Sequence, residues 1–126
     1  MTEQAETTTQ GKPQISFDEF AKVDLRVAKV LEASDHPDAD RLLVLKVDDG
    51  SGTPRQICAG IKGHYAASDM VGRSIVIVAN LAPRKIRGQE SNGMLLAGSD
   101  GAKGEAERRV VVLTPAGDLA PGSIVT

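Results

Sequence analysis

The chain has 126 residues, 40% of them hydrophobic and 25% charged, which is the balance of an ordinary soluble protein with one domain and one modest core. A formal net charge of -2 and an isoelectric point of about 5.6 exclude a protein that coats nucleic acid through overall positive charge, so any such contact must depend on a local basic patch. No apolar run approaches the ~18 residues that cross a bilayer, and the first residues carry no secretory signal.

Residues 1–14 are polar and rich in threonine, and they offer almost nothing to bury. We expect them to be a disordered leader, because no burial offsets the entropy of fixing them. The folded domain is expected to cover residues 15–126. Ser16 followed by Glu19 is a capping box, with Ile15 and Phe20 at the two flanking staple positions. This pattern predicts a short helix from residue 17 to about residue 22.

The pattern changes to strands after residue 24. Leu25 and Val27 lie on one face of the first strand and Val30 on the other, which predicts a bulge near Ala28 or Lys29 that bends the strand. A turn at residues 36–38 follows, and a second strand is predicted over residues 42–47. The glycines of residues 49–52 predict a hairpin into a third strand over residues 56–59.

The second half of the chain predicts two further core strands. Residues 61–71 are interrupted by glycine and can hold a short helix. Residues 73–79 form the fourth strand, and residues 75–78 are apolar at every position, which predicts burial on both faces. Residues 83–92 are polar and basic and are expected to be a loop. Residues 94–97 form the fifth strand, and a short strand is expected over residues 110–113.

These elements favour an all-β fold, a five-stranded OB-fold barrel with short helices and a C-terminal β extension. A small β-sandwich is the alternative. The tail from residue 108 to residue 126 exceeds what a five-stranded barrel needs. Its apolar residues must therefore pack either on the barrel or on a second copy of the chain.

No catalytic or metal site is expected. His36 lies among aspartates, but that pattern also makes a turn, and the chain has no CxxC or HxxxH spacing. Cys58, the single cysteine, lies in mid-strand, where a buried thiol is ordinary core and forms no internal disulfide, as suits a cytoplasmic protein. No phosphate-binding glycine motif occurs, and no cofactor is expected.

The only dense basic run is Arg84, Lys85 and Arg87, which follows the rigid start that Pro83 gives to the loop. Ser91, Asn92, Gly93 and Met94 come next, and small polar groups beside glycine suit close approach to a phosphate–sugar surface. Two alternatives stay open at this point. The run can be a solvated loop without a partner, or Arg84 or Arg87 can pair with Glu90 to shape the loop.

Aromatic content indicates what kind of nucleic acid would fit. OB-folds that hold single strands stack the bases on aromatic side chains. This chain has only Phe17, Phe20 and Tyr65, and both phenylalanines are expected to seat the first helix. The composition therefore favours folded RNA, recognised by its shape and backbone.

Five blocks of residues follow one another along the chain: Asp24-Leu25-Arg26-Val27, His36-Pro37-x-Ala39-Asp40-Arg41-Leu42, Ile57-Cys58-Ala59-Gly60-Ile61, Asn80-Leu81-x-Pro83-Arg84-Lys85-Ile86-x-Gly88 and Ser91-x-Gly93-Met94-Leu95-Leu96-Ala97. In this order they resemble the tRNA-binding domain, the C-terminal dimerisation module of many bacterial methionyl-tRNA synthetases, which also occurs as a free-standing protein. The resemblance implies an OB-fold, a homodimer, and binding of the tRNA elbow without amino-acid specificity.

The resemblance also implies which residues face RNA. The predicted RNA-binding residues are Asn80, Arg84, Lys85, Arg87, Ser91, Asn92 and Met94. Asn92 departs from the family, which commonly has glutamate or glutamine there. The catalytic signature motifs of the synthetase are absent, which predicts a non-catalytic protein. The single cysteine predicts the cytoplasm, and the lack of a long apolar run predicts no membrane partner. The protein is either a free-standing tRNA-binding protein or the C-terminal domain of a methionyl-tRNA synthetase, whose catalytic domain would then be its partner. A protein-interaction or chaperone module on the same barrel is the alternative function.

Overall fold

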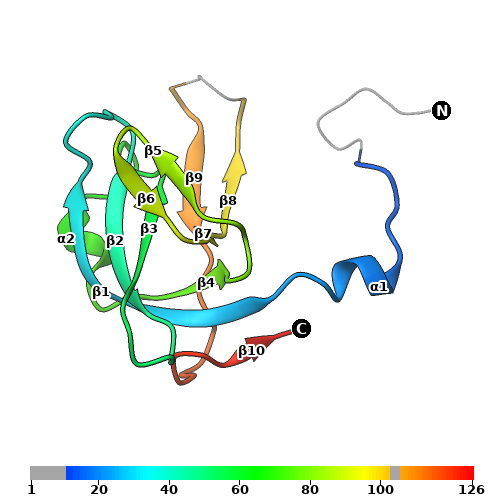
Figure 1. Ribbon diagram of the computed structural model, residues 1–126. Coiled ribbons are helices and arrows are strands. Elements are labelled where there is room, and N and C mark those ends of the chain that lie inside the picture. Colours follow the sequence, from blue (N-terminus) through cyan, green and yellow to red (C-terminus); the bar gives the residue numbers. More distant parts are fainter. Residues whose placement is uncertain (1–10, 103–105) are drawn as a thin grey trace.

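The computed structural model describes residues 11–102 and 106–126 (Figure 1). Its main sheet is an antiparallel path in the order β3-β2-β1-β4-β7 that curls into a nearly closed barrel. The OB-like barrel predicted from the sequence is thus confirmed. The strands of this path are β1 (Leu25–Asp35), β2 (Leu43–Asp48), β3 (Arg55–Ala59), β4 (Ser74–Val78) and β7 (Met94–Leu95).

The long strand β1 serves both halves of the barrel. Its first half pairs with β4 and its second half with β2, with a register shift between Val30 and Glu32. The bulge predicted near residues 28–29 therefore lies slightly farther along the strand. Val27 and Ala28 are buried side by side because Val27 lies against the C-terminal segment, which also bonds to its backbone, while Ala28 lies in the core. Because both faces of β1 are buried here, apolar residues occur on both, and this is the pattern that was interpreted as an earlier bulge.

The core is aliphatic and fills the inside of the barrel. The short helix α2 (Ala67–Met70) closes one side of it with Met70, which is fully buried. In β4, Ile75, Ile77 and Val78 are buried as predicted, but Val76 is only partly buried. Val76 instead lines an apolar groove on the outside of the barrel together with Leu113 and Leu119, so burial on both faces was wrong at this position.

Three short pairings stand outside the barrel. The segment expected to be a loop is a hairpin of β5 (Arg84–Ile86) and β6 (Gln89–Ser91). The predicted fifth strand ends at Leu95, and the chain continues as β8 (Ala97–Asp100), which pairs with β9 (Arg109–Val112) in a ribbon. Finally β10 (Ile124–Val125) pairs with the start of β1, so part of the surplus tail packs on its own barrel.

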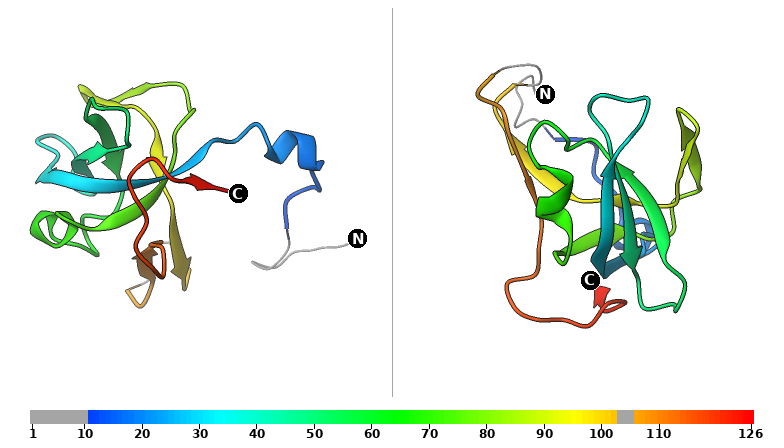
Figure 2. Two further views of the ribbon diagram at one scale, coloured as in Figure 1. Left: turned by 90° about the horizontal axis from the view of Figure 1, so that it is seen from below. Right: turned by 90° about the vertical axis from the view of Figure 1, so that its left-hand side faces the viewer.

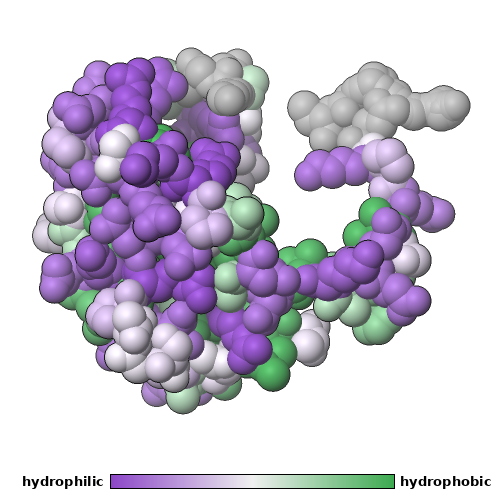
Figure 3. Space-filling model, viewed as in Figure 1, coloured by the Kyte–Doolittle hydropathy of each residue, from purple (hydrophilic) through white to green (hydrophobic). Residues whose placement is uncertain are grey.

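The helix α1 (Phe17–Phe20) begins at the predicted capping box of Ser16 and Glu19, but it projects away from the barrel (Figures 1 and 2). Phe17 is 79% and Phe20 41% exposed, so the expectation that both are buried to seat this helix was wrong. Local caps define the helix, whereas no part of the described chain covers it. We call the segment of residues 11–24, which contains α1, the arm. Figure 3 shows apolar side chains among the polar ones of the arm.

Residues 1–10 of the predicted leader lie outside the described residues, and residues 11–16 have no regular structure. In the ranges that are described, the helices are all too short and too polar to traverse a lipid bilayer.

Candidate nucleic-acid interface

The basic hairpin, as we call residues 84–91, has the densest positive charge of the chain. Its turn is formed by Arg87 and Gly88, both with positive φ, at 49° and 87°, as a two-residue turn between twisted strands requires. Lys85 lies opposite Glu90 and Arg84 opposite Ser91. Among the residues that the structure describes, none forms an ion pair with Arg84, Lys85 or Arg87. The alternative in which Glu90 neutralises an arginine of the loop is therefore not what the structure has.

The tip of the basic hairpin is fastened to the turn between β1 and β2. His36 is buried, and its Nδ1 accepts a hydrogen bond of 2.9 Å from the amide of Asp38. Nε2 therefore carries the proton and donates to the carbonyl of Ile86, also at 2.9 Å. Arg87 adds a bond of 3.2 Å from Nη1 to the carbonyl of Asp38. His36 thus acts as a structural clamp, and Arg87 helps to shape the tip.

The base of the hairpin is fastened to β3. Ser91 is only 5% exposed, and its hydroxyl accepts from the amide of Cys58 at 3.0 Å and donates to the carbonyl of Gly93 at 3.1 Å. The side-chain amide of Gln56 donates through Nε2 to the carbonyl of Glu90 at 2.9 Å. Both ends are therefore held, and the cations of the hairpin are displayed on a fixed frame rather than on a free loop.

Arg55 supports the same base from inside the molecule. Its Nη1 donates to the carbonyls of Ala79 and Asn92, each at 2.9 Å, and its Nε pairs with Asp49 at 2.9 Å. Burial alone would raise the pKa of the Asp49 carboxyl, but hydrogen bonds from Ser51 and Arg55 outweigh burial and hold that pKa below its usual value. This ion pair fixes the guanidinium that holds the end of β4 beside the start of β7.

The remaining predicted residues have different surroundings. Asn80 is exposed, but its side chain accepts from the amide of Asp24 at 2.9 Å and donates to the carbonyl of Lys22 at 2.7 Å, which ties the arm to the barrel. Asn92 is exposed, and its backbone donates to the carbonyl of Gln56 and accepts from Arg55. Met94 is 46% exposed beside the hairpin.

The structure thus brings Arg84, Lys85, Arg87 and Met94 to an accessible surface, whereas Ser91 is buried beneath it. Sequence reasoning missed Arg55 and Gln56 and did not assign His36 to this site. Their partners lie 24 to 50 residues away along the chain, so no local pattern could indicate them.

Cys58 does not form a reactive centre. Burial raises the pKa of its thiol, and nearby Arg84 offsets this only in part, so the thiol stays protonated at neutral pH. Within residues 11–102 and 106–126, no three histidine, cysteine or acidic side chains are grouped closely enough to hold a metal ion.

Comparison with known families gives a match over residues 25–124 to a family described as a putative tRNA binding domain. The chain is 50% identical over 109 residues to a methionine–tRNA ligase of Thermococcus kodakarensis, which covers 86% of this chain and 14% of that protein. It is also 50% identical over 114 residues to a methionine–tRNA ligase of Chloroherpeton thalassium, covering 90% of this chain and 15% of the relative. The chain therefore spans about a seventh of the length of these curated relatives.

Two solved structures of similar fold are chains of about the same size. A MetRS related protein from Pyrococcus horikoshii superposes with a TM-score of 0.79 at 27% identity, over 91% of this chain and 100% of that one. The chaperone CsaA of Bacillus anthracis gives a TM-score of 0.76 at 30% identity, over 90% of this chain and 100% of the other. The chain thus matches a segment of these long relatives and the whole of these two solved chains.

Proposed function

The chain belongs to the tRNA-binding domain family, and from this premise we propose that it binds tRNA through the basic hairpin, as a non-catalytic auxiliary to aminoacylation. The single observation that carries the proposal is the display of Arg84, Lys85 and Arg87 on a hairpin fixed at both ends, with none of them paired to an acid of the described residues. Cations that no acid neutralises are available to phosphates, and a fixed frame reduces the entropy cost of binding.

The RNA surface that we propose centres on Arg84, Lys85, Arg87 and Met94. Ser91 belongs to it indirectly, because its buried hydroxyl holds the base of the hairpin. Asn80 likewise supports the surface through its bonds to the arm, while the exposed side chain of Asn92 is free to reach a bound RNA. Direct contacts and framework residues thus alternate along the same stretch of sequence.

Folded RNA is the form that we expect this surface to prefer. The two phenylalanines lie on the arm and Tyr65 bonds through its hydroxyl to the amide of Val112, so no aromatic side chain lies beside the hairpin to stack successive bases. The test is competition for bound tRNA. Unfractionated tRNA should displace the labelled probe far better than a poly-U strand of similar charge, and equal competition would overturn the preference for folded RNA.

Because the chain spans about a seventh of its synthetase relatives, its larger context is part of the proposal. We place it in the cytoplasm beside a methionyl-tRNA synthetase catalytic domain, either in one chain or as a separate protein. It would raise the affinity of that enzyme for tRNA without choosing the amino acid. Adding the isolated chain to a synthetase that lacks it should lower the KM for tRNA and leave kcat nearly unchanged if the two act in trans.

A homodimer is the assembly that we propose. Its support is an apolar surface that one copy leaves open, formed by an outside groove of about 630 Å³ and by large side chains around it. Val111, Leu113, Leu119 and Ile124 are each about half exposed or more. The exposed phenylalanines of α1, which projects from the barrel, are further apolar side chains that one copy leaves open. Apolar area of this extent in one region is typical of a protein interface, and two copies would present two basic hairpins to one RNA.

A further inference from the structure

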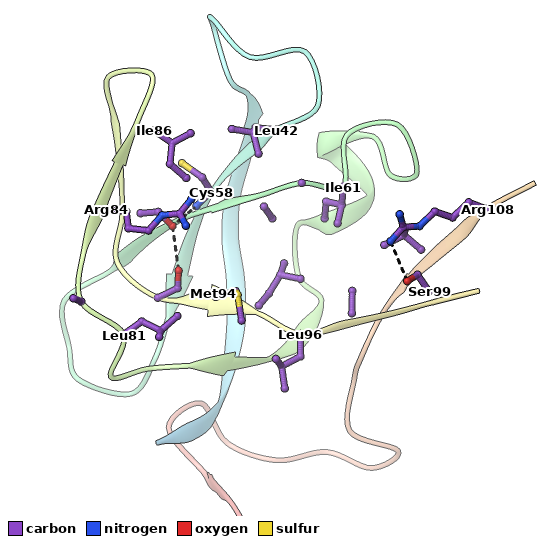
Figure 4. A pocket seen from close by; sticks show the side chains of 18 residues that line it. Leu42, Cys58, Ile61, Leu81, Arg84, Ile86, Met94, Leu96, Ser99 and Arg108 are labelled. Carbon is purple, nitrogen blue, oxygen red and sulfur yellow. Dashed lines mark hydrogen bonds between the residues drawn. The ribbon is translucent and has the colours of Figure 1, made fainter. Parts of the chain in front are cut away.

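A cavity of about 490 Å³ lies at the seam of the barrel, where the strand path ends (Figure 4). β3 and β7 are the two ends of that path, and no ladder joins them. The basic hairpin forms one wall of the cavity through Arg84 and Ile86. The β8–β9 ribbon forms another through Ser99, Arg108 and Val110. The cavity therefore adjoins the exposed face of the hairpin and shares Arg84 and Met94 with the proposed RNA surface.

The chemistry of this cavity is unusual for an acidic chain. Among the residues that the structure describes, no acidic side chain lines it, and the charged side chains that do are Arg84 and Arg108. They lie at opposite sides in Figure 4. The surface between them is aliphatic and contains no aromatic ring; it includes Leu42, Ile61, Met94, Leu95 and Leu96. A ligand suited to it has an apolar body and negative charge at its ends.

Arg108 is only partly satisfied in this position. Its Nη2 donates to the hydroxyl of Ser99 at 3.1 Å, whereas its Nε is buried and has no partner among the described residues. Arg84, on the other side, forms no ion pair with a described residue. A buried guanidinium nitrogen without a partner is costly, and an anionic oxygen would satisfy it.

We propose that the cavity receives one unpaired nucleotide of the bound RNA, with its base among the aliphatic side chains and its flanking phosphates at Arg84 and Arg108. This inference rests on the proposed tRNA binding and makes it more specific. A base that is out of the helical stack offers an apolar face between two phosphates, which paired bases in a duplex do not. An acidic amphipathic peptide has related chemistry, but RNA is favoured because Arg84, which lines the cavity, is also one of the cations of the basic hairpin.

The proposal predicts two components of affinity that respond differently to salt. Phosphate contacts at the hairpin weaken as salt rises, whereas burial of a base among aliphatic side chains does not. The chain should therefore prefer an RNA stem with one unpaired nucleotide over the same stem fully paired. We expect a preference of about tenfold, the scale of burying one apolar group among aliphatic side chains, and it should persist at higher salt.

The test uses the complete chain and two RNA stem-loops that differ only in whether one stem nucleotide is bulged or paired. Ala97→Leu fills the cavity from β8, where Ala97 is exposed, and leaves every cation in place. Ala66→Leu, at an exposed position before α2 and outside the cavity, is the matched control. The parent and Ala66→Leu should prefer the bulged RNA about tenfold, whereas Ala97→Leu should bind both RNAs equally.

The possible failures are distinguishable. If Ala97→Leu retains the full preference for the bulged RNA, or if the parent has none, the cavity is not a nucleotide site although tRNA binding stands. The proposal is also overturned if Ala97→Leu weakens the binding of an acidic amphipathic peptide and leaves RNA binding unchanged, because the cavity then binds a protein partner. If the parent binds neither stem-loop nor unfractionated tRNA, the proposed function itself fails.

Discussion

Ser91 and Asn92 are neighbours in the chain with opposite surroundings. The hydroxyl of Ser91 is buried between the amide of Cys58 and the carbonyl of Gly93, whereas the side chain of Asn92 is exposed. Ser91→Ala leaves a buried amide without an acceptor, so we expect it to lower the free energy of unfolding by about 1–3 kcal/mol. Asn92→Ala should change it by less than about 0.5 kcal/mol. Urea unfolding of both variants measures this, and equal stabilities would contradict the framework role of Ser91.

A second prediction at this scale concerns the pair of Asp49 and Arg55. Because folding holds the pKa of Asp49 below the 3.8 of the free carboxyl, the unfolded chain binds more protons, and the contribution of Asp49 is lost as the pH falls through 3.8 and below. Asp49→Asn removes this dependence. The stability gap between parent and variant should be constant above about pH 5 and should narrow in acid. A gap that is the same at every pH would show that Asp49 has no special pairing.

Single residues were the part of the site that the sequence predicted least well. The cations Arg84 and Lys85 lie where a basic run predicts them, on the surface. Ser91 matched an RNA-facing motif and is nevertheless buried, because the partners that bury it come from β3 and from the start of β7. A motif shows that a position matters to the site, but it does not tell whether the side chain contacts RNA or holds the hairpin in place.

At the scale of elements, the basic hairpin depends on its turn. Gly88 has a φ of 87°, which a residue with a Cβ adopts only at a cost of about 1–2 kcal/mol. We expect Gly88→Ala to reduce the protection of the hairpin amides against hydrogen exchange and to weaken tRNA binding. Gly63→Ala is the control, because Gly63 has no positive φ and an added Cβ meets nothing within 4 Å. Equal protection in the two variants would mean that the turn does not set the hairpin.

The elements with strong local signals could be predicted, and those defined by distant partners could not. The capping box of Ser16 defined the start of α1, and the glycines around Gly50 defined the turn between β2 and β3. Residues 83–92 were expected to be a loop because their strands are short and polar, and their pairing depends on the clamps at His36 and Gln56. The sequence of α1 likewise contains no signal that predicts its position away from the barrel.

At the scale of the whole molecule, the proposed homodimer can be tested by introducing a single charged side chain into the apolar groove. Leu119 is 51% exposed in the open apolar groove, so Leu119→Glu should leave a single copy folded. Burying that carboxylate between two copies would be costly, so the variant should become monomeric in light scattering. Leu31→Glu, at a position that is 43% exposed on β1 and outside the groove, should remain dimeric. A monomeric parent at the same concentration would contradict the proposed dimer.

The measurement that tests the RNA site most directly is the salt dependence of tRNA binding by the double variant Arg84→Ala, Lys85→Ala. Arg87 is left in place because it also holds the tip through Asp38. A control with equal net charge is Lys29→Ala, Lys46→Ala, since both lysines are exposed on the barrel wall. The control should retain the affinity and salt slope of the parent, and all three proteins should have nearly the same thermal stability.

We expect the hairpin variant to bind tRNA far more weakly, with a slope of log affinity against log salt that is smaller by about two, one for each phosphate that the variant no longer neutralises. If the hairpin variant binds as tightly as the parent with an unchanged slope, the basic hairpin is not the RNA site. If the control loses affinity and slope to the same extent, only the overall charge is being measured, and the assignment is equally contradicted.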